Sequence, residues 1–323
     1  MASKEIWLEK YRPRTLDEVQ GNEDALIKLR TIAEEGNVPN MILVGPPGIG
    51  KTSSVLCLAR TLLADVFDSC ALEMNASDER GIDVVREKIK SFAQKKVNLK
   101  PGLHKIIILD EADSLTEGAQ QALRMIISDF ADTTRFVLSC NDSSKLIDAI
   151  QSRCAILRFT KLTDEQVLRR LEEIVEKENI NIDKGGKEAL LFTCEGDMRQ
   201  AINNLQATHT AFKLVNKENV LKVCDVPNVE VLQQVIAECV NGNFHAAQKK
   251  LYPLWEEGYT AYDLVNNLYK LIQTQDMDKQ LQYEFMREMA FLKMKVLEGL
   301  PTFLQISGYL AKISSIANSK KQN

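Results

Sequence analysis

The sequence has no long hydrophobic run, no closely spaced cysteines and no large excess of charge of either sign. No window of its 323 residues approaches about 18 uninterrupted apolar residues, the length that crosses a bilayer, and its first residues lack the apolar stretch of a secretory signal. The chain is therefore expected to be neither membrane-spanning nor secreted. Its 45% hydrophobic and 27% charged residues are ordinary values for a globular protein, which excludes fibrous and low-complexity classes.

Cysteine usage points to a reducing compartment. The number of cysteines is odd, and no two have the short spacing of a zinc-binding pair. The sequence therefore predicts free buried thiols rather than a disulfide framework. The seven residues are Cys57, Cys70, Cys140, Cys154, Cys194, Cys224 and Cys239.

Charge is unevenly distributed along the chain. The 41 Lys and Arg against 45 Asp and Glu give a net charge of -4, which does not favour nucleic-acid binding, but a total does not describe distribution. Between positions 80 and 105, eight basic residues stand against Asp83 and Glu87. This basic stripe predicts salt-dependent contacts with a phosphate backbone without reading of bases, for which Arg80, Arg86 and Lys90 are the candidates. A solvated helix face is the alternative.

Three regions follow from the pattern of apolar residues. In residues 1–160, short apolar runs alternate with helical patterns, which predicts an α/β domain whose parallel sheet is covered by helices. Five strands are predicted, at 41–45, 71–75, 105–110, 135–140 and 155–159. The helices between them are predicted at 52–63, 82–95 and 118–130.

The rest of the chain is predicted to be helical. Thr163 begins a helix with a capping-box pattern, and the segment 183–186, Asp-Lys-Gly-Gly, is expected to break it. With two short helices at 187–194 and 197–210, this predicts a three-helix lid domain over residues 161–226. An all-helical domain is predicted for residues 227–323, with helices at 229–240, 246–257, 260–274 and 280–298.

A nucleotide-binding motif lies between the first strand and the following helix. Residues 45–52 read Gly-Pro-Pro-Gly-Ile-Gly-Lys-Thr, a P-loop whose backbone N–H groups surround phosphates at a helix N-terminus. Lys51 is expected to reach the β and γ oxygens, and Thr52 to ligate Mg²⁺. The candidate phosphate contacts are Gly45, Pro46, Pro47, Gly48, Ile49, Gly50, Lys51, Thr52 and Ser53.

Polar residues at two strand ends supply the expected chemistry of hydrolysis. Asp110 and Glu111 end the third strand, where Asp110 can hold Mg²⁺ and Glu111 can polarise an attacking water. Asn141 follows the fourth strand and could orient that water without repelling phosphate. Solvated acids at a strand end and a turn-forming asparagine are the alternatives.

Two arginines complete the candidate site. Arg199, at the start of a lid helix, could reach the phosphates and report the nucleotide state by moving the lid. Arg153 lies just before the fifth strand, at the far edge of its domain, and is better placed to enter a neighbouring subunit's site as an arginine finger. An exposed or salt-bridged surface arginine is the alternative for each.

Together these segments resemble the AAA+ ATPases and, among them, the small subunits of replication factor C, the eukaryotic sliding-clamp loader. The likeness runs nearly from end to end. Gly81-Ile-Asp-Val-Val-Arg86 and Phe92-Ala-Gln-Lys-Lys96 most resemble the small subunit of the 37/40 kDa type, in which ATP is bound and hydrolysed. The likeness is carried by Trp7-Leu-Glu-Lys-Tyr-Arg-Pro13, Leu72-Glu-Met-Asn-Ala-Ser-Asp-Glu-Arg-Gly81, Asp110-Glu-Ala-Asp113, Gln120-Gln-Ala-Leu-Arg124, Ser152-Arg-Cys154 and Gly196-Asp-Met-Arg-Gln-Ala-Ile-Asn-Asn-Leu-Gln206.

The resemblance implies site roles that spacing alone does not show. It implies that Asn141 is the first sensor, Arg199 the second sensor and Arg153 the finger that acts in trans. Phe92 and Val97 are implied to contact the clamp, with packing against the sheet as the alternative. It also implies that the N-terminal segment closes over adenine through Leu8, Tyr11, Arg12, Pro13, Val19 and Gln20.

The resemblance also implies partners and a location. The last domain would be a collar that holds five subunits together, in a heteropentamer with other replication factor C subunits. ATP with Mg²⁺ would drive opening of the clamp PCNA and its closure on primer–template DNA, without sequence specificity, during replication and repair in the nucleus.

Two other functions stay open from the sequence. One is another AAA+ DNA-processing ATPase, such as a branch-migration motor or a helicase loader, which would need a homohexamer. The other is a non-hydrolysing scaffold subunit of the loader, against which the intact Lys51, Thr52, Asp110, Glu111 and Asn141 argue.

Overall fold

The chain is described by a computed structural model that covers residues 6–77, 82–97, 99, 102–225 and 227–321. It divides into two compact units, Met1–Val223 and Cys224–Asn323. The division falls close to the boundary expected before residue 227. The sheet and the lid helices both lie in the first unit.

A five-stranded parallel sheet forms the centre of the first unit, as predicted. Its strand order is β2-β3-β4-β1-β5, and each strand begins and ends within one residue of the prediction. Nearly all residues of β1, β3 and β4 are buried, since these three strands lie inside the sheet and are covered on both faces. The strands are β1 (Met41–Val44), β2 (Ala71–Asn75), β3 (Lys105–Asp110), β4 (Thr134–Cys140) and β5 (Ala155–Arg158).

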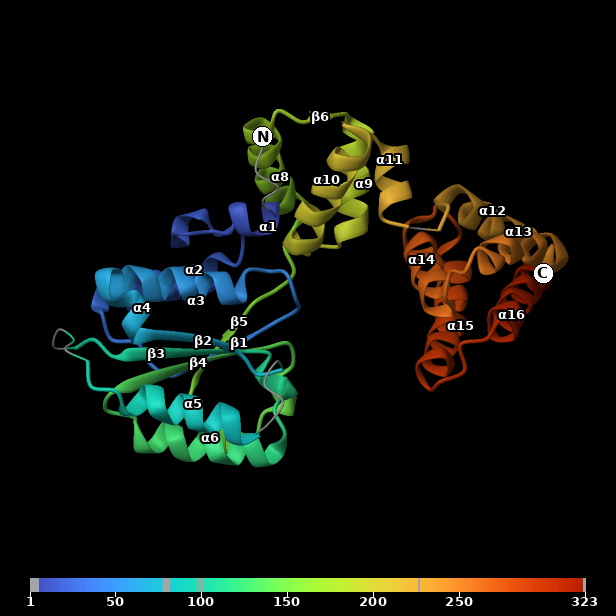
Figure 1. Ribbon diagram of the computed structural model, residues 1–323. Coiled ribbons are helices and arrows are strands. Elements are labelled where there is room, and N and C mark those ends of the chain that lie inside the picture. Colours follow the sequence, from blue (N-terminus) through green and yellow to red (C-terminus); the bar gives the residue numbers. More distant parts are fainter. Residues whose placement is uncertain (1–5, 78–81, 98, 100–101, 226, 322–323) are drawn as a thin grey trace. The chain divides into compact units, whose positions relative to one another are not determined.

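Helices cover both faces of this sheet. Figure 1 shows α2 (Glu23–Glu35) and α3 (Lys51–Leu63) over one face, and α5 (Ile82–Gln94) and α6 (Glu117–Asp129) over the other. The buried residues of α6 recur at the three- and four-residue spacing that puts them on one helical face. The short helices α1 (Trp7–Lys10), α4 (Phe67–Cys70) and α7 (Asp148–Gln151) lie in the connections.

The described part of the lid has four helices, one more than predicted. They are α8 (Asp164–Glu178), α9 (Lys184–Cys194), α10 (Met198–Phe212) and α11 (Lys217–Val223). A two-stranded parallel sheet joins β6 (Asn181–Ile182) to β7 (Leu214–Val215). The sequence did not reveal these strands, because two residues are too few to establish an alternating pattern.

The start of α8 agrees with the sequence and its end does not. The predicted capping box is confirmed, since Thr163 accepts a hydrogen bond from Gln166 N while the Gln166 side chain accepts one from Thr163 N. The predicted break at 183–186 is wrong. Helix α8 ends five residues earlier, at Glu178, and Asn179 in the left-handed region terminates it. Asp183 instead begins the next helix as its N-cap.

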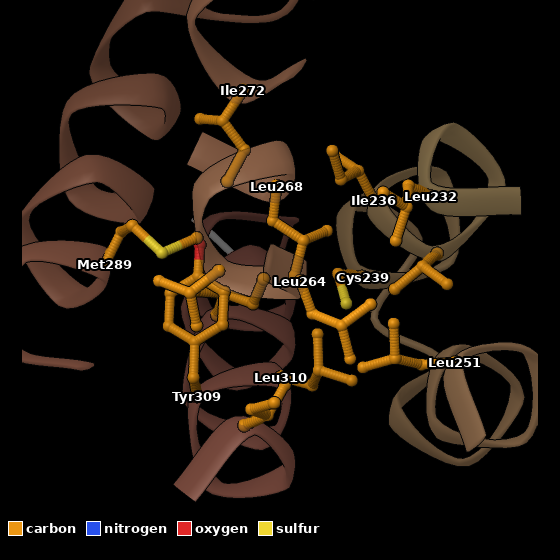
Figure 2. Close-up of a cluster of buried hydrophobic side chains, with 14 of the residues drawn as sticks. Leu232, Ile236, Cys239, Leu251, Leu264, Leu268, Ile272, Met289, Tyr309 and Leu310 are labelled. Atoms are coloured by element: carbon orange, nitrogen blue, oxygen red, sulfur yellow. The ribbon is translucent and has the colours of Figure 1, made fainter. Parts of the chain in front are cut away.

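The second unit is helical, as predicted, and has one apolar core. Its helices are α12 (Val229–Val240), α13 (Phe244–Glu256), α14 (Ala261–Thr274), α15 (Lys279–Leu297) and α16 (Phe303–Lys321). Figure 2 shows Ile236, Leu264, Met289 and Leu310, from four of these helices, directed to a common centre. Among the residues that the structure describes, no helix is both long and apolar enough to cross a membrane.

Candidate active site

The strand order places the P-loop and the two polar strand ends, at Asp110 and Asn141, next to one another. In the sheet, β4 lies between β3 and β1, and all strands run in the same direction. Asp110 at the end of β3, Asn141 after β4 and the P-loop after β1 therefore meet at the carboxyl edge. This edge is where open α/β sheets bind ligands.

Lys51 is the buried centre of the P-loop. Its Nζ donates to the carbonyls of Gly45 and Pro46, at 2.5 and 2.7 Å, and to Asn141 Oδ1 at 3.2 Å. Burial lowers the pKa of Lys51, and the nearby Asp110 carboxylate acts in the opposite direction. The contact with Asn141 brings together a P-loop residue and a strand-end residue that lie 90 positions apart in the sequence.

The acidic pair is joined to the P-loop by one hydrogen bond. Thr52 Oγ1 donates to Asp110 Oδ2 at 2.7 Å, and the other carboxylate oxygen of Asp110 accepts from Glu111 N at 3.0 Å. Glu111 is exposed and has a left-handed backbone, with φ of 52°, where the chain leaves the strand. Asp113 holds the next strand end, since its Oδ2 accepts from Asn141 N at 3.2 Å.

A cavity of about 220 Å³ opens over these groups and includes most of the predicted nucleotide contacts. Gly45 and Pro46 are not among the described residues that line it, and their carbonyls serve Lys51 instead. The predicted residues in the wall are Leu8, Tyr11, Arg12, Pro13, Val19, Gln20, Pro47, Gly48, Ile49, Gly50, Lys51, Thr52, Ser53, Asp110, Glu111, Asn141 and Arg199.

The lid contributes wall residues that the sequence did not identify. Met198 and Ile202 line the cavity together with Arg199, and Met198 N donates to Gly48 O at 3.0 Å. Helical spacing from Arg199 would have suggested Ile202. No sequence signal marks Arg170, a buried arginine of α8 that also lines the cavity. Glu9, Glu18 and Leu162 complete the wall.

Arg153 lies apart from this cavity. It follows α7, is exposed, and donates through a guanidinium nitrogen to Ala149 O at 2.6 Å. It is not one of the described cavity residues. The expectation that it is a poor candidate for its own site agrees with this placement.

The predicted DNA and clamp residues are described only in part. Arg80 lies outside the described residues, and so does the side chain of Arg86 on α5. Lys90 on the same helix is exposed. Phe92 and Val97 are half-buried, and Phe92 packs against the core between the sheet and helices α5 and α6. The packing that was the alternative for Phe92 is therefore present.

Comparison with known proteins identifies the family. One family model, described as the ATPase family associated with various cellular activities, matches residues 41–162, and another, the replication factor C C-terminal domain, matches residues 227–312. Replication factor C subunit 2 of Arabidopsis thaliana is 50% identical over 98% of this chain and 95% of its own length. Replication factor C subunit 4 of Schizosaccharomyces pombe is 51% identical over 95% of this chain and 90% of its own length.

A solved structure shares the fold. The Holliday junction branch migration motor RuvB of Thermotoga maritima aligns with a TM-score of 0.54 and 22% sequence identity, over 71% of this chain and 79% of the motor. These relatives are about 50% identical to the chain over nearly its whole length. Together with both family models, they confirm the resemblance that the motifs indicated. The chain belongs to the replication factor C small-subunit family of clamp-loader AAA+ ATPases.

Proposed function

We propose that this chain hydrolyses ATP in the cavity between the sheet edge and the lid, as one subunit of a loader that opens a sliding clamp and closes it on primer–template DNA. The observation that carries this proposal is that Lys51 and Thr52 of the P-loop meet Asn141 and Asp110 of the strand ends, through one hydrogen bond each, within one cavity. Hydrolysis in such a machine acts as a timer, because it removes the γ-phosphate contacts that hold the lid and its neighbours in place.

Magnesium fits the oxygen atoms at this edge. The Thr52 hydroxyl and an Asp110 carboxylate oxygen lie 2.7 Å apart, and Mg²⁺ in nucleotide sites is held by one or two such side chains together with phosphate oxygens. In the part of the chain that the structure describes, no group of three or more His, Cys, Asp or Glu side chains could hold a metal by itself. When bound with ATP, Mg²⁺ would offset the negative charge of the β and γ oxygens.

Each side chain then has a separate task. Lys51 is positioned to bind the phosphate oxygens, and Glu111 to accept a proton from the attacking water. The side-chain amide of Asn141 can orient that water through Oδ1 or Nδ2, without adding negative charge beside the phosphate. Arg199, on the lid helix that contacts Gly48, is placed to bind the γ-phosphate and to move with the lid.

The remaining assignments extend to partners. We place Arg153 in the site of a neighbouring subunit, because it is exposed and apart from its own cavity. The relatives are named as subunits, which supports action within a multi-subunit complex. We propose that this complex is a heteropentamer in the nucleus. Phe92 and Val97 are the proposed contacts with PCNA. Arg80, Arg86 and Lys90 are the proposed contacts with primer–template DNA.

Two variants test the enzymatic proposal. Glu111→Gln is expected to bind ATP as the parent does while turnover in the assembled complex falls by about 10²–10⁴, the usual effect of losing a general base. Lys51→Ala is expected to lose ATP binding. Glu117→Gln, at an exposed position of α6, is the matched control and should change neither quantity. Undiminished turnover with Glu111→Gln would instead favour the scaffold alternative.

A third variant tests the finger. Arg153→Ala should leave ATP affinity at its own P-loop intact and slow turnover of the assembled complex by about 10³–10⁵. Loss of its own ATP affinity would contradict action in trans. The native mass of the complex provides an independent check, since five different subunits support the loader and six identical ones would support a branch-migration motor.

A further inference from the structure

The N-terminal segment is attached to the lid. Trp7 N donates to the Gln206 side chain on α10 at 3.0 Å, and the Trp7 ring lies 5.8 Å from the ring of His209 on the same helix. At the other end of this short helix, the Tyr11 hydroxyl donates to Glu178 at 2.6 Å. Both aromatic side chains are buried, although they come from the first turn that the structure describes.

Glu178 is the residue on which this attachment converges. Its Oε1 accepts from Lys10 Nζ at 2.5 Å as well as from Tyr11. The hydrogen bond from Lys10 and, to a smaller extent, the one from Tyr11 hold the pKa of Glu178 below its usual value. The carboxylate is therefore ionised at neutral pH. Charge-assisted hydrogen bonds of this kind are stronger than neutral ones. Glu178 is not among the described residues of the cavity wall.

Arg170 makes the second attachment through the backbone. It lies on α8, is only 8% exposed, and one nitrogen of its guanidinium donates to Tyr11 O at 2.7 Å. Another nitrogen pairs with Glu173 at 2.5 Å, which compensates the buried charge. Two separate nitrogens of the planar guanidinium thus serve the two acceptors at once.

The same segment passes to the sheet domain within two residues. The Cys57 thiol on α3 donates to Pro13 O at 3.3 Å, and Arg12 pairs with Glu73 of β2 at 3.4 Å. Leu8, Tyr11, Arg12 and Pro13 all line the cavity. The segment therefore forms a bridge across the cavity wall, with residues 7–11 held by the lid and residues 12–13 held by the sheet domain.

We infer that Arg170 and Glu178 are positioning residues that attach the base-contacting segment to the lid, so that recognition of the nucleotide base is coupled to movement of the lid. This inference rests on the proposed binding of ATP in the cavity. With the phosphates of ATP at the P-loop, the base would contact residues 8–13 in the same cavity wall, and this segment is held by the lid. Weakening the attachment should therefore reduce affinity for a ligand that has a base, and leave affinity for bare phosphates unchanged.

The decisive variant is Glu178→Gln, because Glu178 is outside the described cavity wall and can act on the ligand only through the segment. In the full-length chain, we expect its affinity for ATP to fall about tenfold, the effect of losing a charged hydrogen bond. Affinity for inorganic tripolyphosphate, measured by competition, should not change. Arg170→Met is expected to show the same selective loss. The matched control is Glu172→Gln, elsewhere on α8, which removes the ion pair with Lys187 of α9.

Trp7 provides a readout that does not depend on ligand. In a Trp255→Phe background it is the one remaining tryptophan, and Glu178→Gln should shift its emission to longer wavelength as the ring leaves His209. Parent-like ATP affinity, an unshifted emission, or an equal loss for ATP and tripolyphosphate would each overturn the inference. Lys51→Ala tests the proposed ATP site separately from the attachment of the segment, because it should abolish binding of both ATP and tripolyphosphate. If it abolishes neither, the proposed ATP site itself is wrong.

Discussion

Gly48 is the P-loop residue whose side-chain position is already filled by the lid. A Cβ there would lie 1.7 Å from Asp197 Oδ1, and the backbone has a φ of +69°. Asp197 cannot simply move away, because the same oxygen caps α10 by accepting from Gln200 N at 3.1 Å. The P-loop and the lid helix that presents Arg199 therefore depend on glycine at this position.

We expect Gly48→Ala to destabilise the first unit by about 2 kcal/mol, from the left-handed backbone together with loss of the cap. ATP affinity should fall as well, since Arg199 is two residues from the displaced Asp197. Urea denaturation and calorimetric titration measure the two effects. Gly118→Ala is the control, because this helical glycine has open space around it, and it should stabilise the protein by about 0.5–1 kcal/mol. A Gly48→Ala protein as stable as the parent would contradict the proposed contact.

The buried thiols are expected to be unreactive. All seven cysteines are free, as predicted, although Cys154 and Cys224 are only partly buried. Burial raises the pKa values of Cys57, Cys140, Cys154 and Cys239 to about 11. At pH 8 about one in a thousand of each would be thiolate, the reactive form.

Iodoacetamide at pH 8 should therefore leave these four thiols unmodified in the native protein, and labelling should accelerate as the pH rises toward 11. Peptide mass spectrometry measures the extent at each position. The unfolded chain is the control, in which all seven should react. Rapid native labelling of Cys140, next to Asn141, would show that the sheet edge opens to solvent.

At the scale of elements, the start of α9 shows where local pattern reasoning fails. A Gly-Gly pair normally disfavours a helix, which is why a break was predicted at 183–186. In the structure both glycines lie inside α9, and a Cβ on Gly186 would lie 2.3 Å from Val215 O. The glycine allows β7 to pass close to the helix, a requirement that only the partner strand reveals. Asp183 Oδ1 accepts from Gly186 N at 2.5 Å and begins the helix.

Asp183→Ala is expected to cost about 1 kcal/mol of stability, because the N-cap hydrogen bond is lost at the first turn of α9. Asp183→Asn keeps a side-chain oxygen and should cost little, which makes it the matched control. Thermal unfolding followed by circular dichroism measures both. Equal stabilities for the alanine variant and the parent would indicate that α9 begins without its cap.

The site itself was predictable where its parts are contiguous in sequence. The P-loop, Asp110 and Glu111 are local motifs, each following a strand, and their expected places in the cavity agree with the structure. Met198, Ile202 and Arg170 were missed because they enter the wall only when α8 and α10 fold over the sheet edge. Long-range packing of this kind leaves no mark in a short window of sequence.

At the scale of the whole molecule, the nucleotide cavity belongs to one unit. Every residue of its described wall lies between Leu8 and Ile202, and the first compact unit ends at Val223. The second unit has its own core, in which Phe285 is fully buried. Binding of ATP and stability of the second unit should therefore be separable.

A chain that ends at residue 223 is expected to bind ATP with an affinity within about twofold of the full chain, because no wall residue is removed. Calorimetric titration measures the affinity, and circular dichroism establishes that the fragment is folded. The complementary control is Phe285→Ala in the full chain, which should destabilise the second unit by about 3–5 kcal/mol with unchanged ATP affinity. A folded fragment without ATP binding would refute the separation.

Local sequence alone was sufficient for the class of fold and for the motifs that line the cavity. Short apolar runs, helical spacing and a P-loop motif each depend on neighbours in the chain, so the bounds of all five strands were predicted to within a residue. The folded chain was needed to show which distant groups meet. The contacts of Lys51 with Asn141, of Gly48 with the start of α10, and of Tyr11 with Glu178 join positions that lie far apart. They arise from the strand order and from packing of the lid, which depend on the whole set of contacts rather than on any one segment.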